Sequence, residues 1–215
     1  MLVKIEVSSS SDAFMLFESL NNRGVPLSPI DLVKNSLLAK LDKKGENIDE
    51  AFAKWNLIID FLPNEPDQER FLRQYYNCFK YDEFISIKGQ AKATRSNLIK
   101  IYEELINRDV HRVFNELLDK SKIYNNFIDP FNNEERSELD SNLFDLINVK
   151  AVPAYTFLLY LFSHYPNLET STYVEILNYL KKWFLRRNLT NFPSTNHLDA
   201  IFMKLIEHIE MAKLN

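Results

Sequence analysis

The sequence predicts an all-α protein, mainly a multi-helix bundle of about nine to ten helices. Apolar residues recur at intervals of three and four along most of the chain, which is the spacing of one face of a helix. Only 3 of the 215 residues are glycine, which argues against glycine-rich turn architectures. Hydrophobic residues make up 46% of the chain and charged residues 26%, a balance typical of a globular protein with a buried core.

The chain opens with a short strand-like stretch. Residues 2–7 are rich in valine and isoleucine and alternate in part, and four serines follow them. A single strand cannot satisfy its edge groups alone, so we interpret this stretch as the remnant of a sheet. A helix is expected next, from the capping residue Asp12 to about Asn21, and Gly24 ends its pattern.

The second expected helix has the clearest start signal in the sequence. Ser28 is a capping residue, Pro29 suits the first helical position, and Asp31 follows three residues after the serine. This arrangement is a variant of the capping box. The apolar spacing continues from there to a break at Gly45.

The same spacing predicts eight further helices, each bounded by proline, glycine or clusters of Asn, Asp, Ser and Thr. Thr94 is expected to cap one of them, and residues 86–92 are expected to form a surface loop. The acidic stretch from Asp129 to Asp145 is expected to be a solvated connector followed by a helix start. The expected helical segments are residues 46–61, 67–80, 95–107, 109–127, 137–148, 153–164, 172–190 and 196–213.

Composition excludes several classes of site. The three glycines, Gly24, Gly45 and Gly89, stand far apart, so the sequence has neither a Walker phosphate loop nor a GxGxxG dinucleotide fingerprint. The four histidines show no HxxxH or HxH spacing, and no second cysteine is present to complete a zinc motif. Cys78 has no histidine near it in the sequence, and we expect it to be a small core residue.

The number of cysteines indicates the cellular compartment of the protein, and its apolar runs and net charge indicate which partners it can bind. One cysteine cannot form an internal disulfide, which fits a reducing compartment, and we expect a cytoplasmic protein. No apolar run approaches the roughly 18 residues of a membrane span, so no membrane contact is expected. The net charge of -4 does not mark the whole chain as a nucleic-acid binder.

Two basic clusters are nevertheless candidates for contact with nucleic acid, because Lys and Arg bind phosphates. Lys181, Lys182, Arg186 and Arg187 flank the apolar residues 183–185. The alternative is structural, since these apolar residues suit a core helix whose flanking cations face solvent. The second cluster consists of Lys88, Lys92, Arg95 and Lys100.

Residues 13–35 carry the most specific information. They read AFMLFESLNNRGVPLSPIDLVKN. This segment resembles the FE-x-LN-x-RG-x-x-LS-x-x-DL-x-KN signature of the GmrSD-type restriction endonuclease family, in the part that closes its N-terminal ParB/sulfiredoxin-like domain of formerly unknown function. Trp55 and residues 71–76 and 183–187 resemble the helical region that follows in this family, so the resemblance spans most of the chain.

The resemblance implies a division of the chain and a context for it. Residues 1–42 would be the tail of the ParB/sulfiredoxin-like domain, with one strand and two helices, and residues 43–215 a helical domain. The resemblance implies a role in DNA restriction and phage defence. In this family, the N-terminal domain carries a DGQQR motif tied to nucleotide hydrolysis, and a C-terminal His-Asn-His-like domain cuts DNA. This sequence contains neither signature. We therefore expect a fragment whose helical region couples nucleotide sensing to DNA cleavage and is non-catalytic by itself.

The resemblance also implies cofactors and partners. We expect no cofactor in this chain, whereas a nucleoside triphosphate and a divalent metal belong to the full-length parent. The expected partners on this basis are DNA and the N-terminal and nuclease domains of the parent protein. Independently of the resemblance, a second copy of the chain is a further candidate partner.

The corner between the first two expected helices suits a phosphate. Asn21 and Gly24 lie where a helix is expected to end, which holds Arg23 on a short loop. The helix that starts at Ser28 presents free N–H groups, which favour anions. The alternative is that Arg23 pairs with a nearby carboxylate and the corner is purely structural. The candidate residues for nucleotide or phosphate contact are Asn21, Arg23, Gly24, Ser28 and Lys34.

The sequence leaves two other functions open. The first is a nucleic-acid-binding helical module, which predicts DNA binding that weakens with salt and on neutralising Arg186 and Arg187. The second is a structural or protein-interaction domain with residues 129–145 as its partner surface.

Overall fold

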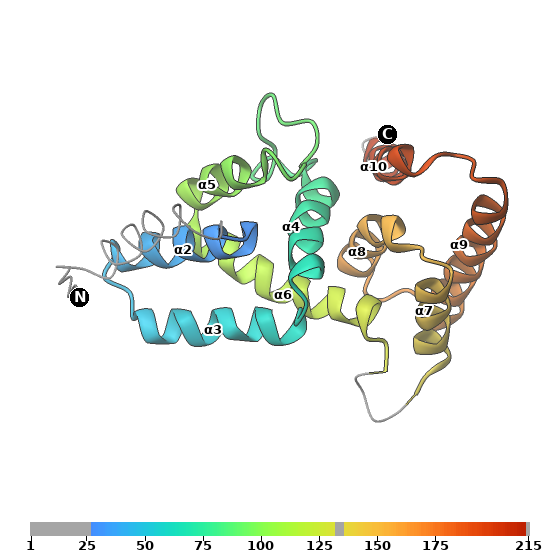
Figure 1. Ribbon diagram of the computed structural model, residues 1–215, viewed down its shortest axis with the longest axis horizontal. Coiled ribbons are helices and arrows are strands. Elements are labelled where there is room, and N and C mark those ends of the chain that lie inside the picture. Colours follow the sequence, from blue (N-terminus) through green and yellow to red (C-terminus); the bar gives the residue numbers. More distant parts are fainter. Residues whose placement is uncertain (1–26, 132–135, 214–215) are drawn as a thin grey trace, which may run out of the picture. The chain divides into compact units, whose positions relative to one another are not determined.

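The structure, a computed structural model, describes residues 27–131 and 136–213 (Figure 1). These residues form nine α-helices and one short 3-10 helix, and no strand occurs among them, which confirms the predicted all-α class. None of these helices combines the length and apolarity needed to cross a bilayer. The predicted strand at residues 2–7 and the predicted helix that follows it lie outside the described residues. The helices are α2 (Pro29–Asp42), α3 (Ile48–Phe61), α4 (Glu65–Phe79), α5 (Leu98–Arg108), α6 (Val110–Ile128), α7 (Glu138–Asn148), η1 (Val152–Ala154), α8 (Tyr155–His164), α9 (Thr170–Thr190) and α10 (Thr195–Lys213).

The chain divides into two compact units. Unit 1 consists of Met1–Arg73 and Ile87–Leu118, and unit 2 consists of Gln74–Ser86 and Asp119–Asn215. Both α4 and α6 contribute residues to each unit, because the boundaries fall within these helices. The division at residue 42, which the family resemblance implies, stays a prediction.

The helix α2 of unit 1 begins as its sequence predicts. Ser28 is the N-cap: its Oγ accepts the backbone N–H of Asp31 at 3.3 Å and donates to the Asp31 carboxylate at 2.7 Å. Pro29 lies in the first turn, where its missing N–H would have no partner within the helix. After α2, Gly45 has a φ of +77°, a conformation that glycine adopts without strain.

The core of unit 1 forms where α2 packs against α3 and α5 (Figure 1). Trp55 of α3 is among the largest side chains there, and 2% of its surface is exposed. Its ring centroid lies 6.2 Å from that of Phe114 on α6. Burial of such apolar area is the main favourable contribution to folding. The other core residues include Leu37, Leu38, Phe71, Ile101 and Leu117.

The start of α5 corrects a sequence prediction. Thr94 is not the N-cap, because the helix begins at Leu98 and Asn97 occupies the capping position without a side-chain cap hydrogen bond. The Asn97 side chain fastens the preceding loop instead, since its Oδ1 accepts the backbone N–H of Thr94 at 2.7 Å and the Thr94 hydroxyl at 2.9 Å. Within the predicted surface loop at residues 86–92, Ile87 is buried.

In unit 2, α7 lies beside α9, and α8 packs against α10 (Figure 1). The acidic stretch starts α7 through a complete capping box, in which Ser137 and Asp140 each accept the backbone N–H of the other. The rings of Tyr124, Phe127 and Tyr155 contact one another, with centroids 5.7 to 5.9 Å apart. These aromatic residues are therefore part of the core of unit 2.

Candidate functional site

The predicted phosphate site is described in part. Its two described residues, Ser28 and Lys34, both contact the Asp31 carboxylate at the first turn of α2. The remaining three residues lie outside the described part of the chain: Asn21, Arg23 and Gly24.

Asp31 holds the ammonium group of Lys34. Lys34 Nζ lies 2.9 Å from Asp31 Oδ1, while the Ser28 hydroxyl donates to the other carboxylate oxygen. Partial burial by itself would raise the pKa of Asp31, but the hydrogen bonds from Ser28 and Lys34 outweigh it and lower the pKa. A hollow of about 320 Å³ opens beside these residues and is also lined by Trp55 and Gln68. A phosphate that used Lys34 would therefore have to compete with Asp31.

The helix α9 carries the first basic cluster, and two of its four cations are engaged within unit 2. Lys181 Nζ lies 2.7 Å from Asp145 Oδ2 on α7. Arg187 donates from Nε to the carbonyl oxygen of Pro193 at 3.0 Å and from Nη2 to Thr195 Oγ1 at 2.6 Å. Lys181 thus links α9 to α7, and Arg187 holds the segment that connects α9 to α10.

The other two cations of this cluster, Lys182 and Arg186, are exposed. They lie four residues apart and therefore on one side of α9. In the second predicted cluster, Arg95 Nε lies 3.3 Å from Glu69 Oε2. The structure thus separates the predicted nucleic-acid residues of α9 into a structural pair and a solvent-facing pair.

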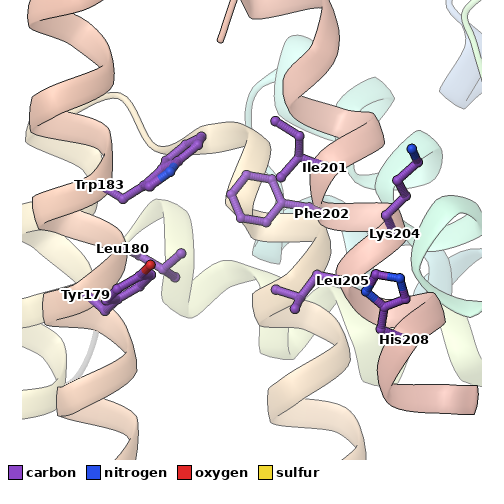
Figure 2. A pocket seen from close by; sticks show the side chains of 8 residues that line it. All are labelled: Tyr179, Leu180, Trp183, Ile201, Phe202, Lys204, Leu205 and His208. Carbon is purple, nitrogen blue, oxygen red and sulfur yellow. The ribbon is translucent and has the colours of Figure 1, made fainter. Parts of the chain in front are cut away.

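An apolar groove of about 400 Å³ runs between α9 and α10, beside the solvent-facing pair (Figure 2). Leu180 and Phe202 are buried at its floor. Tyr179 is 70% exposed at its edge, and Ile201 and Leu205 are 37% and 38% exposed. Figure 2 shows Phe202 and Leu205 facing the α9 side chains across the groove. The apolar lining residues are Tyr179, Leu180, Trp183, Ile201, Phe202 and Leu205.

An aromatic cluster joins the two helices at the groove. Trp183 meets Phe202 edge-on, with ring centroids 6.0 Å apart. Phe184, which is buried, stacks on Phe202 at 6.0 Å with an interplanar angle of 8°. Because the Phe184 and Phe202 rings are buried and hold Trp183 at the groove, the groove is a preformed feature of unit 2.

The two walls of the groove carry the same residue pattern. Residue i is Tyr179 on α9 and Ile201 on α10. On each helix, residues i, i+1 and i+4 are apolar, and residues i+3 and i+7 are basic. Because residues three, four and seven apart share a face of a helix, each wall has an apolar strip with basic residues beside it, and on α10 these basic residues, Lys204 and His208, line the groove itself. Figure 2 shows the labelled residues of α9 and α10 running in opposite directions. The pattern is Tyr179, Leu180, Lys182, Trp183 and Arg186 on α9, and Ile201, Phe202, Lys204, Leu205 and His208 on α10.

The rims are more basic than acidic. Lys182, Arg186, Lys204 and His208 are all exposed. Glu175, at the N-terminal side of the groove on α9, is an exposed acid on the same helix. A ligand with an apolar centre and acidic flanks would therefore be complementary to this surface.

Comparison with known proteins found no matching family model, no matching curated protein and no matching solved structure. The GmrSD-type resemblance therefore stays a prediction carried by residues 13–35, of which residues 13–26 lie outside the described part of the chain.

The groove is not predicted from the sequence, because Trp183 suits a core helix and no apolar residue of α10 stands out as a candidate site residue. A signal is nevertheless present. The apolar residues of α10 cover a wider arc of the helix than one core contact requires. These residues are Leu198, Ile201, Phe202, Leu205, Ile206 and Ile209.

A separate polar cluster connects α8 with the end of α10. The Tyr160 hydroxyl donates to Glu210, and Lys213 donates to Tyr160 Oη at 2.8 Å and to Glu210 Oε1 at 2.9 Å. Nearby Cys78 is buried, and burial raises the pKa of its thiol, which confirms the expected core role. In the described part of the chain, no group of three or more His, Cys, Asp or Glu residues is placed to hold a metal ion.

This polar cluster predicts a pH-dependent contribution to stability. Partial burial alone would raise the pKa of Glu210, but hydrogen bonds from Tyr160 and Lys213 outweigh it and lower the pKa. Its contribution is therefore present above the ordinary value of 4.5 and is lost as the pH falls through the folded-state pKa. Burial would lower the pKa of Lys213, but its hydrogen bonds to Tyr160 and Glu210 raise it, so this contribution is lost only as the pH rises above 10.5.

Glu210→Gln is expected to lower the free energy of unfolding at pH 7 by less than about 1 kcal/mol, because solvent screens this partly exposed pair. Urea unfolding of the variant and the parent chain at pH 7 and at about pH 3 measures the effect. The difference between the two proteins is expected to be smaller at the lower pH and to shrink further as the pH falls through the folded-state pKa of Glu210. A difference that persists there contradicts the assignment of the pH dependence to Glu210.

Proposed function

We propose that this chain is a protein-interaction module whose α9–α10 groove binds an apolar helical segment of a protein partner. The observation that carries the proposal is an open apolar groove with basic residues along both rims. Concave apolar surface is costly to leave in water, and such patches mark sites of interaction on soluble proteins. The groove also combines exposed Tyr179 with Trp183, and these two residue types dominate binding energy at interfaces.

A helix suits the shape of this site. Two antiparallel helices form the walls, and an amphipathic helix places its apolar face into such a groove through residues three and four apart. The aromatic cluster of Trp183, Phe184 and Phe202 supports the groove from within unit 2. Little rearrangement is therefore needed on binding, and a preformed surface loses less entropy when it is occupied.

A protein segment suits the groove better than nucleic acid does. Affinity for nucleic acid comes largely from neutralising phosphates. Of the four α9 cations predicted for this role, Lys181 and Arg187 are engaged within unit 2. The surface beside Lys182 and Arg186 is apolar, so the remaining cations flank a hydrophobic site.

The family resemblance supplies a context for such a module. A helical region that couples a nucleotide-sensing domain to a nuclease domain needs a surface that another domain contacts, and the groove offers one. Support for this context comes from the sequence of residues 13–35. The role in GmrSD-like DNA restriction or phage defence, with DNA and the parent's domains as partners, is a proposal on that basis. The cytoplasmic location is a proposal that rests on the single cysteine.

The proposal predicts that the groove binds a designed amphipathic helix. A labelled peptide of about 20 residues, with a Leu/Phe stripe flanked by Glu, is expected to bind the full chain with a Kd of about 1 to 100 µM in fluorescence anisotropy. Leu205→Glu places a charge on the groove wall, and this change is expected to weaken binding by at least about tenfold. The same peptide with Lys in place of Glu is expected to bind more weakly, because the rims are basic.

Leu189→Glu is the matched control. It makes the same substitution on α9 at a leucine that is 88% exposed and does not line the groove. Binding to this variant is expected to stay within about twofold of the parent chain. Equal losses in both variants, or no binding of the acidic peptide to the parent chain, would rule out the groove as a docking site.

A further inference from the structure

The polar side chains that line the α9–α10 groove can all donate a hydrogen bond. Lys204 and the Trp183 indole can only donate, and the Tyr179 hydroxyl and the His208 ring each carry one O–H or N–H group at least. No Asp, Glu, Asn or Gln is among the lining residues of this groove in the described chain. A ligand must therefore supply the acceptor itself, and a negatively charged acceptor forms the strongest bonds to such donors.

Two of these donors are not engaged by the fold. In the described part of the chain, the side chains of Lys204 and His208 form no hydrogen bond or ion pair with another residue. They differ in this from Lys181, which is bound to Asp145. Because they lie four residues apart on α10, they share one side of that helix. The α10 wall thus offers a cation and a ring N–H group to a ligand in the groove.

The groove has the size of a small-molecule site. Its volume of about 400 Å³ lies within the range of about 300 to 1,000 Å³ that is usual for such sites. Ile201 and His208 are separated by about 10 Å along α10, at a rise of about 1.5 Å per residue. The extended alkyl chain of decanoate has a similar length, whereas a membrane lipid with two longer chains exceeds the volume of the groove.

We infer that the groove also binds a small amphipathic carboxylate, a medium-chain fatty acid, which competes with the partner helix. The alkyl chain lies against Leu180, Phe202 and Leu205, and the carboxylate meets Lys204 and His208 at the edge of the groove. Figure 2 shows Lys204 extending away from α9, so its ammonium group is placed for a head group at the outer edge rather than at the floor. This inference rests on the proposed function and names a regulator of that same groove.

The two parts of such a ligand have different effects. The alkyl chain supplies most of the binding energy, because apolar area leaves water. An exposed ion pair with Lys204 adds little affinity, but it selects a carboxylate over an ammonium group. The fatty acid and an acidic amphipathic helix both need the apolar surface of Phe202 and Leu205, so only one of them occupies the groove at a time.

The inference predicts that decanoate binds the full chain at Trp183. A two-dimensional NMR spectrum shows one indole N–H signal for each of the two tryptophans, and the signal that is lost in Trp183→Phe identifies Trp183. Decanoate is expected to move this signal and to leave that of Trp55 in place, with a Kd of about 0.1 to 1 mM. Decylammonium has the same chain with a cationic head group and is expected to bind at least about fivefold more weakly.

Lys204→Glu is the decisive variant, because it reverses the charge at the edge of the groove. It is expected to weaken decanoate binding by about three- to tenfold and to strengthen decylammonium binding. Damage to the fold would weaken both ligands, so opposite changes identify an effect of charge. Equal binding of the two ligands to the parent chain, or changes in the same direction in this variant, would overturn the inference.

Lys122→Glu is the matched control for this variant. It makes the same substitution at an exposed lysine of unit 2 that does not line the groove. Both Kd values are expected to stay within about twofold of those of the parent chain. A response equal to that of Lys204→Glu would show that net charge, and not the groove, selects the ligand.

A competition experiment separates this inference from the proposed function. Decanoate is expected to displace the labelled acidic peptide and to lower its fluorescence anisotropy. If the peptide binds and decanoate neither moves the Trp183 signal nor displaces the peptide, the proposed function stands and this inference fails. If decanoate moves the Trp183 signal with the expected charge preference and the peptide does not bind, the proposed function fails and the carboxylate site stands.

Discussion

Trp55→Ala is expected to lower the free energy of unfolding by about 3 to 5 kcal/mol. Trp55 is 2% exposed and its ring lies 6.2 Å from that of Phe114, in the region where α2, α3 and α5 pack. Truncation removes buried apolar area and leaves a cavity that three helices cannot close. This loss is a large share of the roughly 5 to 15 kcal/mol that stabilises a typical domain. Urea unfolding followed by far-ultraviolet circular dichroism measures it.

Leu57→Ala is the control for Trp55→Ala, because Leu57 lies on the open side of the same helix. Its expected cost is below about 0.5 kcal/mol. The Trp55→Ala variant also leaves Trp183 as its single tryptophan, so fluorescence then reports unfolding of unit 2. A loss below about 1 kcal/mol for Trp55→Ala would contradict its place in the core of unit 1.

Gln74→Leu is expected to destabilise unit 2 by about 2 to 4 kcal/mol. Gln74 is buried and makes two hydrogen bonds: its Oε1 accepts from the Tyr124 hydroxyl at 2.7 Å, and its Nε2 donates to the Val152 carbonyl at 3.0 Å. Leucine has a similar volume but offers neither group, so the Tyr124 hydroxyl loses its bond to Gln74, and the Val152 carbonyl keeps only the hydrogen bond from the Tyr155 backbone N–H. Loss of a buried partner costs more than the net value of a hydrogen bond, because the remaining group is kept from water.

A double-mutant cycle tests this account of Gln74. Tyr124→Phe removes the hydroxyl that donates to Gln74, so Gln74→Leu is expected to cost about 1 kcal/mol less in that background than in the parent chain. Urea unfolding of the four proteins gives the coupling energy. Strict additivity would show that the Gln74–Tyr124 hydrogen bond does not carry the effect.

Most of the helices follow from local signals. Helix caps involve residues within three positions of one another, so they can be recognised in the sequence without a structure. Examples are the cap at Ser28, the proline that follows it and the capping box at Ser137. The apolar spacing marks the length of each helix in the same way. Thr94 shows where such reasoning fails. Its side chain had the right type for a cap, but Asn97 holds the preceding loop and α5 begins later.

The candidate site was accessible to sequence reasoning only in part. Lys181, Lys182, Arg186 and Arg187 form one cluster in sequence, yet the structure engages the first and last and leaves the middle pair exposed. The partner of Lys181 is Asp145 on another helix, and no local rule predicts that pairing. Apolar spacing likewise cannot say which apolar face of a helix is covered.

By itself, the sequence determined that this chain is helical and where its helices lie, because caps, prolines and apolar spacing act over a few neighbouring residues. The tertiary structure decided that the strips beginning at Tyr179 and Ile201 face each other as an open groove, and that the outer face of α3 stays exposed. Whether an apolar residue is buried depends on which helix packs against it, and that contact joins residues far apart in the chain.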